Sequence, residues 1–206
     1  MSEFMSYDPW SQITTRNGIE GDLIISALQK SIRRGLTEDA VIFAYEMYIT
    51  SEQLEDKLWR RLQAVSVEDV GFGDLNAPVL INTLNQMRKE FPYADADRPI
   101  FFIHAVRYLA AAKKDRTTDN LKNIVKLGFA HGQKPEIPDF AIDKHTKKGR
   151  ALGRDAKHFQ TEGSRLENEL IVDENYKPRL MELLDKIEKE KPETVDNAFV
   201  YSGWQT

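Results

Sequence analysis

The chain has 206 residues, of which 41% are hydrophobic and 30% are charged. This length fits one large domain or a main domain with an appendage, and this composition excludes a chain that is disordered throughout. A formal charge of −4 excludes a uniformly basic nucleic-acid-binding coat, and the lack of cysteine excludes a disulfide scaffold and thiolate metal sites.

A helical period dominates the first part of the chain. One apolar stripe predicts a helix from about residue 20 to 34, which Gly35 is well placed to end. Thr37 is expected to cap the helix that follows it. The same reading predicts further helices at residues 37–48, 51–65, 77–91, 100–112 and 118–132.

The helix at 100–112 differs from its neighbours because it is apolar on almost every face. Such a helix is usually a central one, so we expect it to be buried, with Asp97 as its cap and His104 as a hydrogen-bonded core histidine. His131 suits the C-terminus of the next helix. No period-two strand pattern is found, so the sequence predicts an all-α helical bundle.

The chain divides into four expected segments. Residues 1–18 form an N-terminal arm, 19–132 a helical oligomerisation body, 133–170 a basic, glycine-containing segment packed on the body, and 171–206 a final helix and tail. The two prolines of residues 133–139 mark the break after the body. The final helix is expected near residues 176–191, and the tail is expected to dock through Phe199, Tyr201 and Trp204.

Arg60, Arg61, Glu68, Asp69 and Gly71 gather two arginines and two acids around a helix terminus. Paired carboxylates can hold Mg²⁺ or act as acid and base, but adjacent acids point in different directions on a helix. We favour a structural role, in which Ser66 and Asp69 cap a helix start and the acids pair with Arg60 or Arg61.

Residues 144–157, called the basic segment below, hold six cations against one acid, a local surplus of +5. The rest of the chain must then sum to −9, since −4 − 5 = −9. Clustered cations of this kind bind DNA backbone or phosphate, form a solvated face, or are neutralised by the acidic rest of the protein or by a neighbouring subunit. The DNA- or phosphate-binding candidates are Lys144, His145, Lys147, Lys148, Arg150, Arg154 and Lys157.

Two further features of this stretch bear on its function. Gly149 and Gly153 are four residues apart, so on one helix they would share a face open to close backbone approach. Asp143 and His145 could form an acid/base pair, but they diverge on a helix, so only a loop would bring them together. The pair therefore leaves a second hypothesis open, in which the chain is a small enzyme or binder that acts on phosphate-containing or nucleic-acid substrates.

Four short blocks follow one another in the order of a known set of motifs. The first block is LQKSIR at 28–33, followed by Asp39-Ala40, and the second is RRL at 60–62, followed by EDVG at 68–71 and Asp74. The third block is AV and YLA at 105–110, followed by Ala112 and Lys114. The fourth block is IP at 137–138, followed by Asp143, His145, Gly149, Leu152 and Gly153. These blocks resemble the C-terminal region of the MgsA/RarA family, bacterial relatives of the Werner-helicase-interacting ATPase. The second block departs from the family pattern, with Val67 before Glu68 where the family has serine.

The resemblance implies an all-helical oligomerisation region, like the collar of clamp-loader subunits, in a family of DNA-dependent ATPases that assemble as tetramers at stalled replication forks. The sequence contains no phosphate loop, and after Gly153 the family's tyrosine- and proline-rich ending is not recognisable. We therefore expect a non-catalytic module for oligomerisation and DNA maintenance, without cofactor or metal. Its expected partners are copies of itself, with a tetramer first and a dimer second, and also DNA and a motor-bearing homologue.

No apolar run reaches the roughly 18 residues of a membrane span, and the first ten residues lack the apolar core of a signal peptide. We expect a soluble cytoplasmic protein with no membrane partner.

Overall fold

The computed structural model describes residues 9–190, and the predicted docking tail at 193–206 lies outside them. The chain divides into two compact units, Met1–Gln133 and Lys134–Thr206. The predicted packing of residues 133–170 on the helical body stays a prediction.

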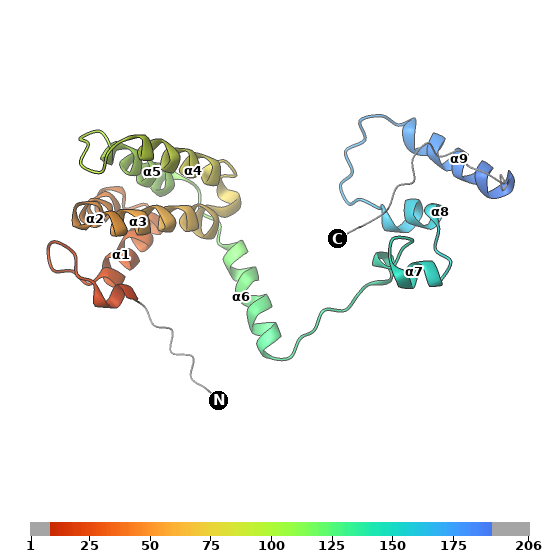
Figure 1. Cartoon of the computed structure of the whole chain (residues 1–206), viewed down its shortest axis with the longest axis horizontal. Coiled ribbons are helices and arrows are strands. Elements are labelled where there is room, and N and C mark those ends of the chain that lie inside the picture. The colour runs from red at the N-terminus through yellow and green to blue at the C-terminus, as the bar shows by residue number, and fades with distance from the viewer. Residues whose placement is uncertain (1–8, 191–206) are drawn as a thin grey trace. The chain divides into compact units, whose positions relative to one another are not determined.

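The described part of the first unit is built from helices, and its one strand-like contact is an isolated bridge between Thr14 and Glu20. This confirms the all-α prediction. Figure 1 shows α1 to α5 gathered together. The helices of this unit are η1 (Pro9–Gln12), α1 (Gly21–Arg34), α2 (Thr37–Thr50), α3 (Glu52–Val65), η2 (Ser66–Val70), η3 (Gly71–Gly73), α4 (Ala77–Met87), η4 (Arg88–Glu90), α5 (Pro99–Ala111) and α6 (Thr117–Ala130).

The helix ends follow local chemistry. Gly35 has φ 73°, and its N–H donates to the Ile32 carbonyl, so it ends α1 as predicted. The Ser51 hydroxyl accepts from the Leu54 N–H at 3.2 Å and caps α3. Two predicted caps are wrong: Thr37 is the first residue of α2 rather than its cap, and α5 begins after Arg98 without a side-chain cap, so Asp97 does not cap it.

The core lies between α1, α2, α3, α4 and α5, and α5 packs against the other four helices. Phe102, Val106 and Leu109 of α5 are fully buried. The opposite face is open, however, because His104 and Arg107 are exposed. The prediction of His104 as a core histidine is wrong, since two polar residues three apart mark the solvent side of this helix.

A carboxylate of α3 is buried inside the bundle and paired with two arginines. Glu55 of α3 has no exposed surface, and its Oε2 lies 2.8 Å from Arg98 Nη2 and 3.0 Å from Arg88 Nη1. Arg98 Nη1 also donates to the carbonyls of Arg88 and Phe91. This buried ion pair ties α3 to the connection between α4 and α5.

Helix α6 differs from the five helices of the bundle. It leaves the bundle (Figure 1) and contacts it mainly through η2 near its first turn. Every residue from Asn120 to Leu127 is exposed. His131 follows its last turn and donates its N–H to the carbonyls of Leu127 and Gly128, which confirms the predicted helix end.

The second unit holds shorter elements and one longer helix. They are η5 (Asp139–Ala141), α7 (Lys147–Ala151), α8 (Ala156–His158), η6 (Phe159–Gly163) and α9 (Tyr176–Glu190). The predicted final helix is confirmed as α9. None of the described helices in either unit is both long enough and apolar enough to cross a membrane.

Candidate functional site

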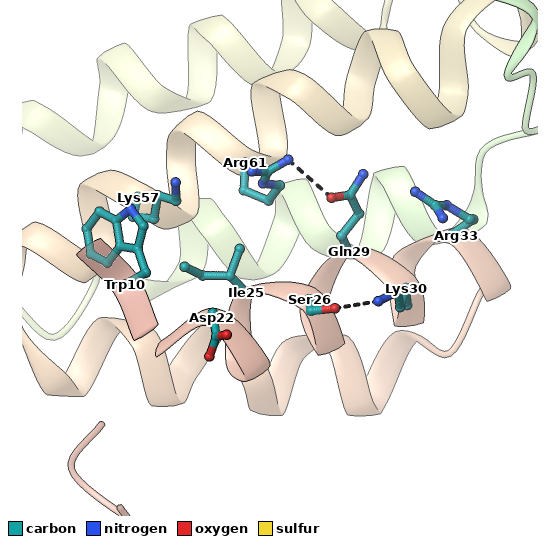
Figure 2. A pocket seen from close by; sticks show the side chains of 9 residues that line it. All are labelled: Trp10, Asp22, Ile25, Ser26, Gln29, Lys30, Arg33, Lys57 and Arg61. Carbon is teal, nitrogen blue, oxygen red and sulfur yellow. Dashed lines mark hydrogen bonds between the residues drawn. The ribbon is translucent and has the colours of Figure 1, made fainter. Parts of the chain in front are cut away.

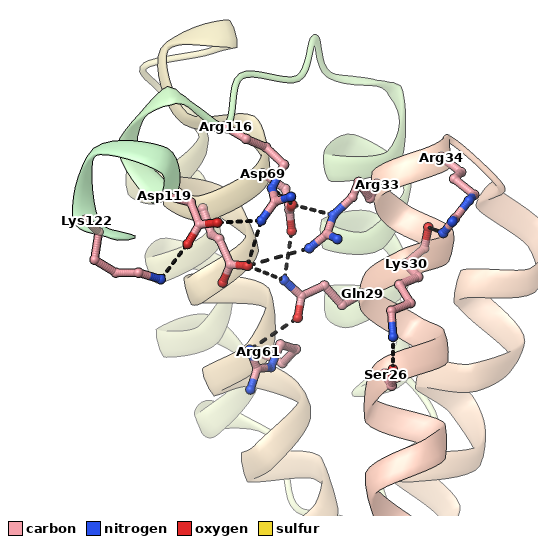
Figure 3. A network of polar contacts seen from close by, with 11 residues as sticks. Ser26, Gln29, Lys30, Arg33, Arg34, Arg61, Asp69, Arg116, Asp119 and Lys122 are labelled. Carbon is pink, nitrogen blue, oxygen red and sulfur yellow. Dashed lines mark hydrogen bonds and ion pairs between the residues drawn. The ribbon is translucent and has the colours of Figure 1, made fainter. Parts of the chain in front are cut away.

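A buried aspartate organises the charged groups where α3 ends. Asp69 lies in the π-helical turn η2, which continues α3, and its side chain has no exposed surface. Its carboxylate accepts from Arg33 Nε at 2.6 Å and from Gln29 Nε2 at 2.9 Å, and it lies 3.2 Å from Arg116 Nε. The Asp69 carbonyl accepts from the Asp115 N–H at 3.0 Å. Asp69 therefore joins α1, α3 and the start of α6 (Figure 3).

Further charged groups complete the arrangement around Asp69. Glu68 Oε1 accepts from Gln29 Nε2 at 3.0 Å and lies 3.5 Å from Arg33 Nη2. Arg116 Nη2 donates to Asp119 at 2.6 Å, and Lys122 also donates to that carboxylate. The Lys122 hydrogen bond, with the nearby Arg116 and Arg33, lowers the pKa of Asp119 below its ordinary value. The Asp69 cluster consists of Gln29, Arg33, Glu68, Asp69, Arg116, Asp119 and Lys122.

The predicted partners of these acids are wrong. Neither Arg60 nor Arg61 makes an ion pair with an acid in the described chain; Arg60 is exposed, and Arg61 Nη1 donates to Gln29 Oε1 at 3.2 Å. Ser66 and Asp69 do not cap a helix start, because η2 continues α3 and the Ser66 hydroxyl donates back to the Gln63 carbonyl. The acids are neutralised by arginines from other segments.

Gly71 has a steric role beside this cluster. Its φ is 50°, and a Cβ at this position would lie 2.6 Å from the Asp115 carbonyl oxygen. Any side chain would push away the connection that carries Arg116. Among the described residues, no group of acids and histidines is arranged to hold a metal ion. The Asp69 cluster is thus a structural joint whose charges satisfy one another.

In the second unit, a loop brings Asp143 and His145 together. His145 Nδ1 lies 2.9 Å from Asp143 Oδ2, and the His145 N–H donates to Asp143 Oδ1 at the same distance. These hydrogen bonds lower the pKa of Asp143. The His145 ring also packs edge-on against Phe159, with ring centroids 4.9 Å apart. The loop makes the arrangement that a helix would have forbidden.

Several cations of the basic segment are held by nearby groups. Arg154 Nη2 donates to both carboxylate oxygens of Asp139, at 2.6 and 2.8 Å. Lys157 Nζ lies 2.7 Å from Asp185 and 3.1 Å from Glu188, both on α9. Arg150 Nη1 donates to the His145 carbonyl at 2.9 Å. Acids distant in sequence therefore neutralise part of the +5 surplus.

The remaining lysines of the segment are more available. Lys144 Nζ lies 5.8 Å from the centre of the Phe159 ring. Lys147 and Lys148 are exposed in α7, and no acid of the described chain pairs with either of them. Lys147 and Lys148 are thus exposed lysines of the candidate set without a paired acid among the described residues, and Lys144 is half-buried.

The two glycines of this segment do not share a helix face. A Cβ on Gly149 would lie 1.7 Å from the Asp143 carbonyl oxygen, so Gly149 lets α7 close against the loop. Gly153 lies beyond α7 with φ 72°, and the Arg154 N–H donates to the Gly149 carbonyl. The two glycines are four residues apart, but they do not lie on one helix because α7 ends at Ala151.

Sequence reasoning missed Gln29, Arg33, Arg116 and Asp119 as members of one cluster. Gln29 and Arg33 are four residues apart, which places them on one face of α1, and this spacing was the available signal. Nothing in the local sequence places Arg116 beside Asp69.

A comparison with protein families matches this sequence to the MgsA AAA+ ATPase C-terminal model over residues 35–195. The comparison with curated proteins gives no match. The matched range takes in most of the chain, including α2 to α9. The chain therefore belongs to the MgsA AAA+ ATPase C-terminal family.

Proposed function

We propose that the chain is a non-catalytic helical module that associates with copies of itself and serves DNA maintenance during replication or repair. Family membership supports this proposal, because the family is the C-terminal part of an AAA+ ATPase of the RarA type. A tetramer is the first choice, as the resemblance implies, and a dimer is the second. A motor-bearing homologue is a natural partner for a module of this kind.

The observation that carries the self-association is the apolar face of α6. Leu121, Ile124, Val125 and Phe129 follow helical spacing, and all four are exposed; the exposed fraction of Ile124 is 65%. Gly128 lies on the same face. Soluble proteins rarely leave a continuous apolar face of this kind uncovered.

Helix stability supports the same conclusion. Helix α6 has 14 residues, and an isolated helix of about 12–15 residues is only marginally stable in water. The Asp69 cluster fixes its first turn through Arg116 and Asp119, but the remaining turns have no packing partner in the first unit. A second copy that packs on the apolar face supplies the missing contacts.

Matched variants of α6 test the proposal. Ile124→Asp places a charge on the apolar face, whereas Asn123→Asp adds the same charge on the polar face. Because burial of an unpaired carboxylate costs several kcal/mol, we expect Ile124→Asp to abolish association and Asn123→Asp to preserve it. Size-exclusion chromatography with light scattering gives the mass. A monomeric wild-type chain, or equal masses for both variants and the wild type, contradicts the proposal.

The DNA contact is proposed for Lys144, Lys147 and Lys148 of the basic segment. Lys147 and Lys148 are exposed and have no acid of the described chain paired with them, and Lys144 is half-buried beside them, which supports a weak, sequence-independent contact with phosphates. The contact is smaller than the charge count of the segment suggests, because Arg154 and Lys157 are already paired.

A second candidate function is a small enzyme or binder that uses Asp143 and His145. The 2.9 Å contact between the two side chains favours it, because a carboxylate that orients an imidazole prepares it to accept a proton. This function also needs cations that bind the anionic substrate, and two of the candidates are already engaged. Arg150 donates to the His145 carbonyl, and Arg154 donates to Asp139. Loss of a measured activity in His145→Gln, with the fold retained, would favour this candidate over the first.

A further inference from the structure

A small cavity lies between α1 and α3, beside the Asp69 cluster and entirely within the first unit (Figure 2). Its volume is about 210 Å³. This is below the roughly 300 Å³ at which pockets for drug-sized ligands begin. The cavity therefore suits one compact chemical group rather than a large ligand. We call it the α1–α3 pocket.

The charge of this pocket is positive, although the chain as a whole is acidic. Lys30, Arg33, Lys57 and Arg61 line it, with Asp22 as the one acid among the lining residues. Asp22 and Lys30 are eight residues apart on α1, which separates them by about 12 Å along the helix axis. The backbones of Lys30 and Arg33 therefore lie toward the end of α1 that is distant from Asp22, and Arg61 contacts that end through Gln29, while the Lys30 ammonium reaches back to Ser26.

Two of these cations keep hydrogen-bonding capacity. Lys30 is exposed, and its Nζ donates to the Ser26 hydroxyl at 2.5 Å, which leaves further protons on the ammonium group. Arg61 Nη1 donates to Gln29, which leaves further N–H donors on the guanidinium group.

The Asp69 cluster fixes the position of Arg61. The Gln29 amide nitrogen donates to Glu68 and Asp69, which turns the amide oxygen toward Arg61. The acids thus hold Gln29, and Gln29 holds the guanidinium at the pocket. A binding group that is already in place loses less freedom when a ligand arrives.

We propose that the α1–α3 pocket binds a phosphate group, held by Lys30 and Arg61 with Arg33 beside them. A guanidinium donates two parallel hydrogen bonds to phosphate oxygens, and an ammonium adds a point charge. This site lies on a different unit from the basic segment and does not depend on self-association. The phosphate belongs either to a nucleic-acid backbone or to a small phosphate ester.

The test measures the binding of inorganic phosphate to the whole chain by titration calorimetry at constant ionic strength. Lys30→Gln and Arg61→Gln each remove one pocket cation, and Lys89→Gln with Lys126→Gln removes two exposed cations of the first unit that do not line the pocket, as the control. We expect about tenfold weaker binding for each pocket cation removed and unchanged binding in the control. Lys30→Gln keeps the test decisive if Arg61→Gln disturbs the fold, because Lys30 is exposed.

Three results overturn the proposal: no phosphate binding to the wild-type chain, equal binding to all variants, or equal weakening by the control. A short DNA duplex then identifies the source of the phosphate. Competition between duplex and phosphate indicates a nucleic-acid backbone, and its absence indicates a small ester. Sedimentation of Lys30→Gln separates this proposal from self-association, since we expect its mass to equal that of the wild type.

Discussion

The Asp69 cluster and the basic segment are both rich in charge, but they differ in how that charge is compensated. In the cluster, arginines from α1 and from the start of α6 surround an acid with no exposed surface. In the basic segment, Arg154 and Lys157 are paired, whereas Lys147 and Lys148 face solvent. Buried and mutually paired charges hold a fold together, and only the exposed and unpaired ones are available to a partner.

The largest expected effect comes from the centre of the cluster. Asp69→Asn leaves Arg33 and Arg116 without their buried counter-charge, so we expect the free energy of unfolding to fall by about 3–5 kcal/mol. Asp139→Asn breaks the exposed pair with Arg154 and is expected to cost at most about 1 kcal/mol. Urea denaturation of both variants measures the difference. Equal losses would show that the two regions do not differ in this way.

Glycine substitutions extend the comparison to backbone contacts. Gly71→Ala and Gly149→Ala each force a Cβ against a carbonyl oxygen, of Asp115 and Asp143 respectively. We expect each to cost about 1–3 kcal/mol, as overpacked sites do. Gly153→Ala, which meets no atom within 4 Å but has φ 72°, provides the milder control at about 1–2 kcal/mol. Hydrogen exchange assigns each loss to its unit, and a loss outside the mutated unit would contradict the division of the chain.

Acid titration probes one carboxylate in each unit, and the pKa values of both are shifted in the same direction. The folded-state pKa values of Asp119 and Asp143 lie below the ordinary 3.8, so each carboxylate stabilises the fold above that pH. This contribution is lost as the pH falls through the folded-state pKa. We expect Asp119→Asn to flatten the acid loss of the first unit and Asp143→Asn that of the second. Thermal unfolding below about pH 5 tests this, and an unchanged acid slope in either variant would refute its assignment.

The smallest expected effect on stability is that of the exposed lysines. Replacing Lys147 and Lys148 by glutamine should leave the unfolding free energy within about 0.5 kcal/mol of the wild-type value. If these lysines contact duplex DNA, the slope of log K against log salt should flatten by about 2 units, since each phosphate contact contributes roughly 0.9. Replacing Arg154 as well removes its ion pair with Asp139. Because this arginine is already paired, we expect its loss to add little to the change in the salt slope.

The helices of the first unit were predictable because their apolar stripes and ends are local signals. Gly35, Ser51 and the stripe of α1 are read within one or two turns of chain. The partners of Asp69 were not predictable in the same way, because Arg116 is distant in sequence and Gln29 carries no charge. His104 was misassigned for a related reason: an apolar average over α5 hides the one face that stays exposed.

The candidate phosphate contacts show the same limit. The sequence identifies the cations of residues 144–157, but it does not reveal that Asp139, Asp185 and Glu188 occupy some of them. The Asp143–His145 contact depends on a loop rather than on a helical spacing. The α1–α3 pocket requires α1 and α3 to meet, which no motif in the sequence specifies.

Sedimentation equilibrium of the wild-type chain at tens of micromolar tests self-association most directly, since an interface of about 8 kcal/mol is occupied at that concentration. The account predicts a mass of four times, or at least twice, the 23.7 kDa of the chain. Hydrogen exchange on the same sample should show protection of α6. A mass of 23.7 kDa throughout the concentration range would contradict the account.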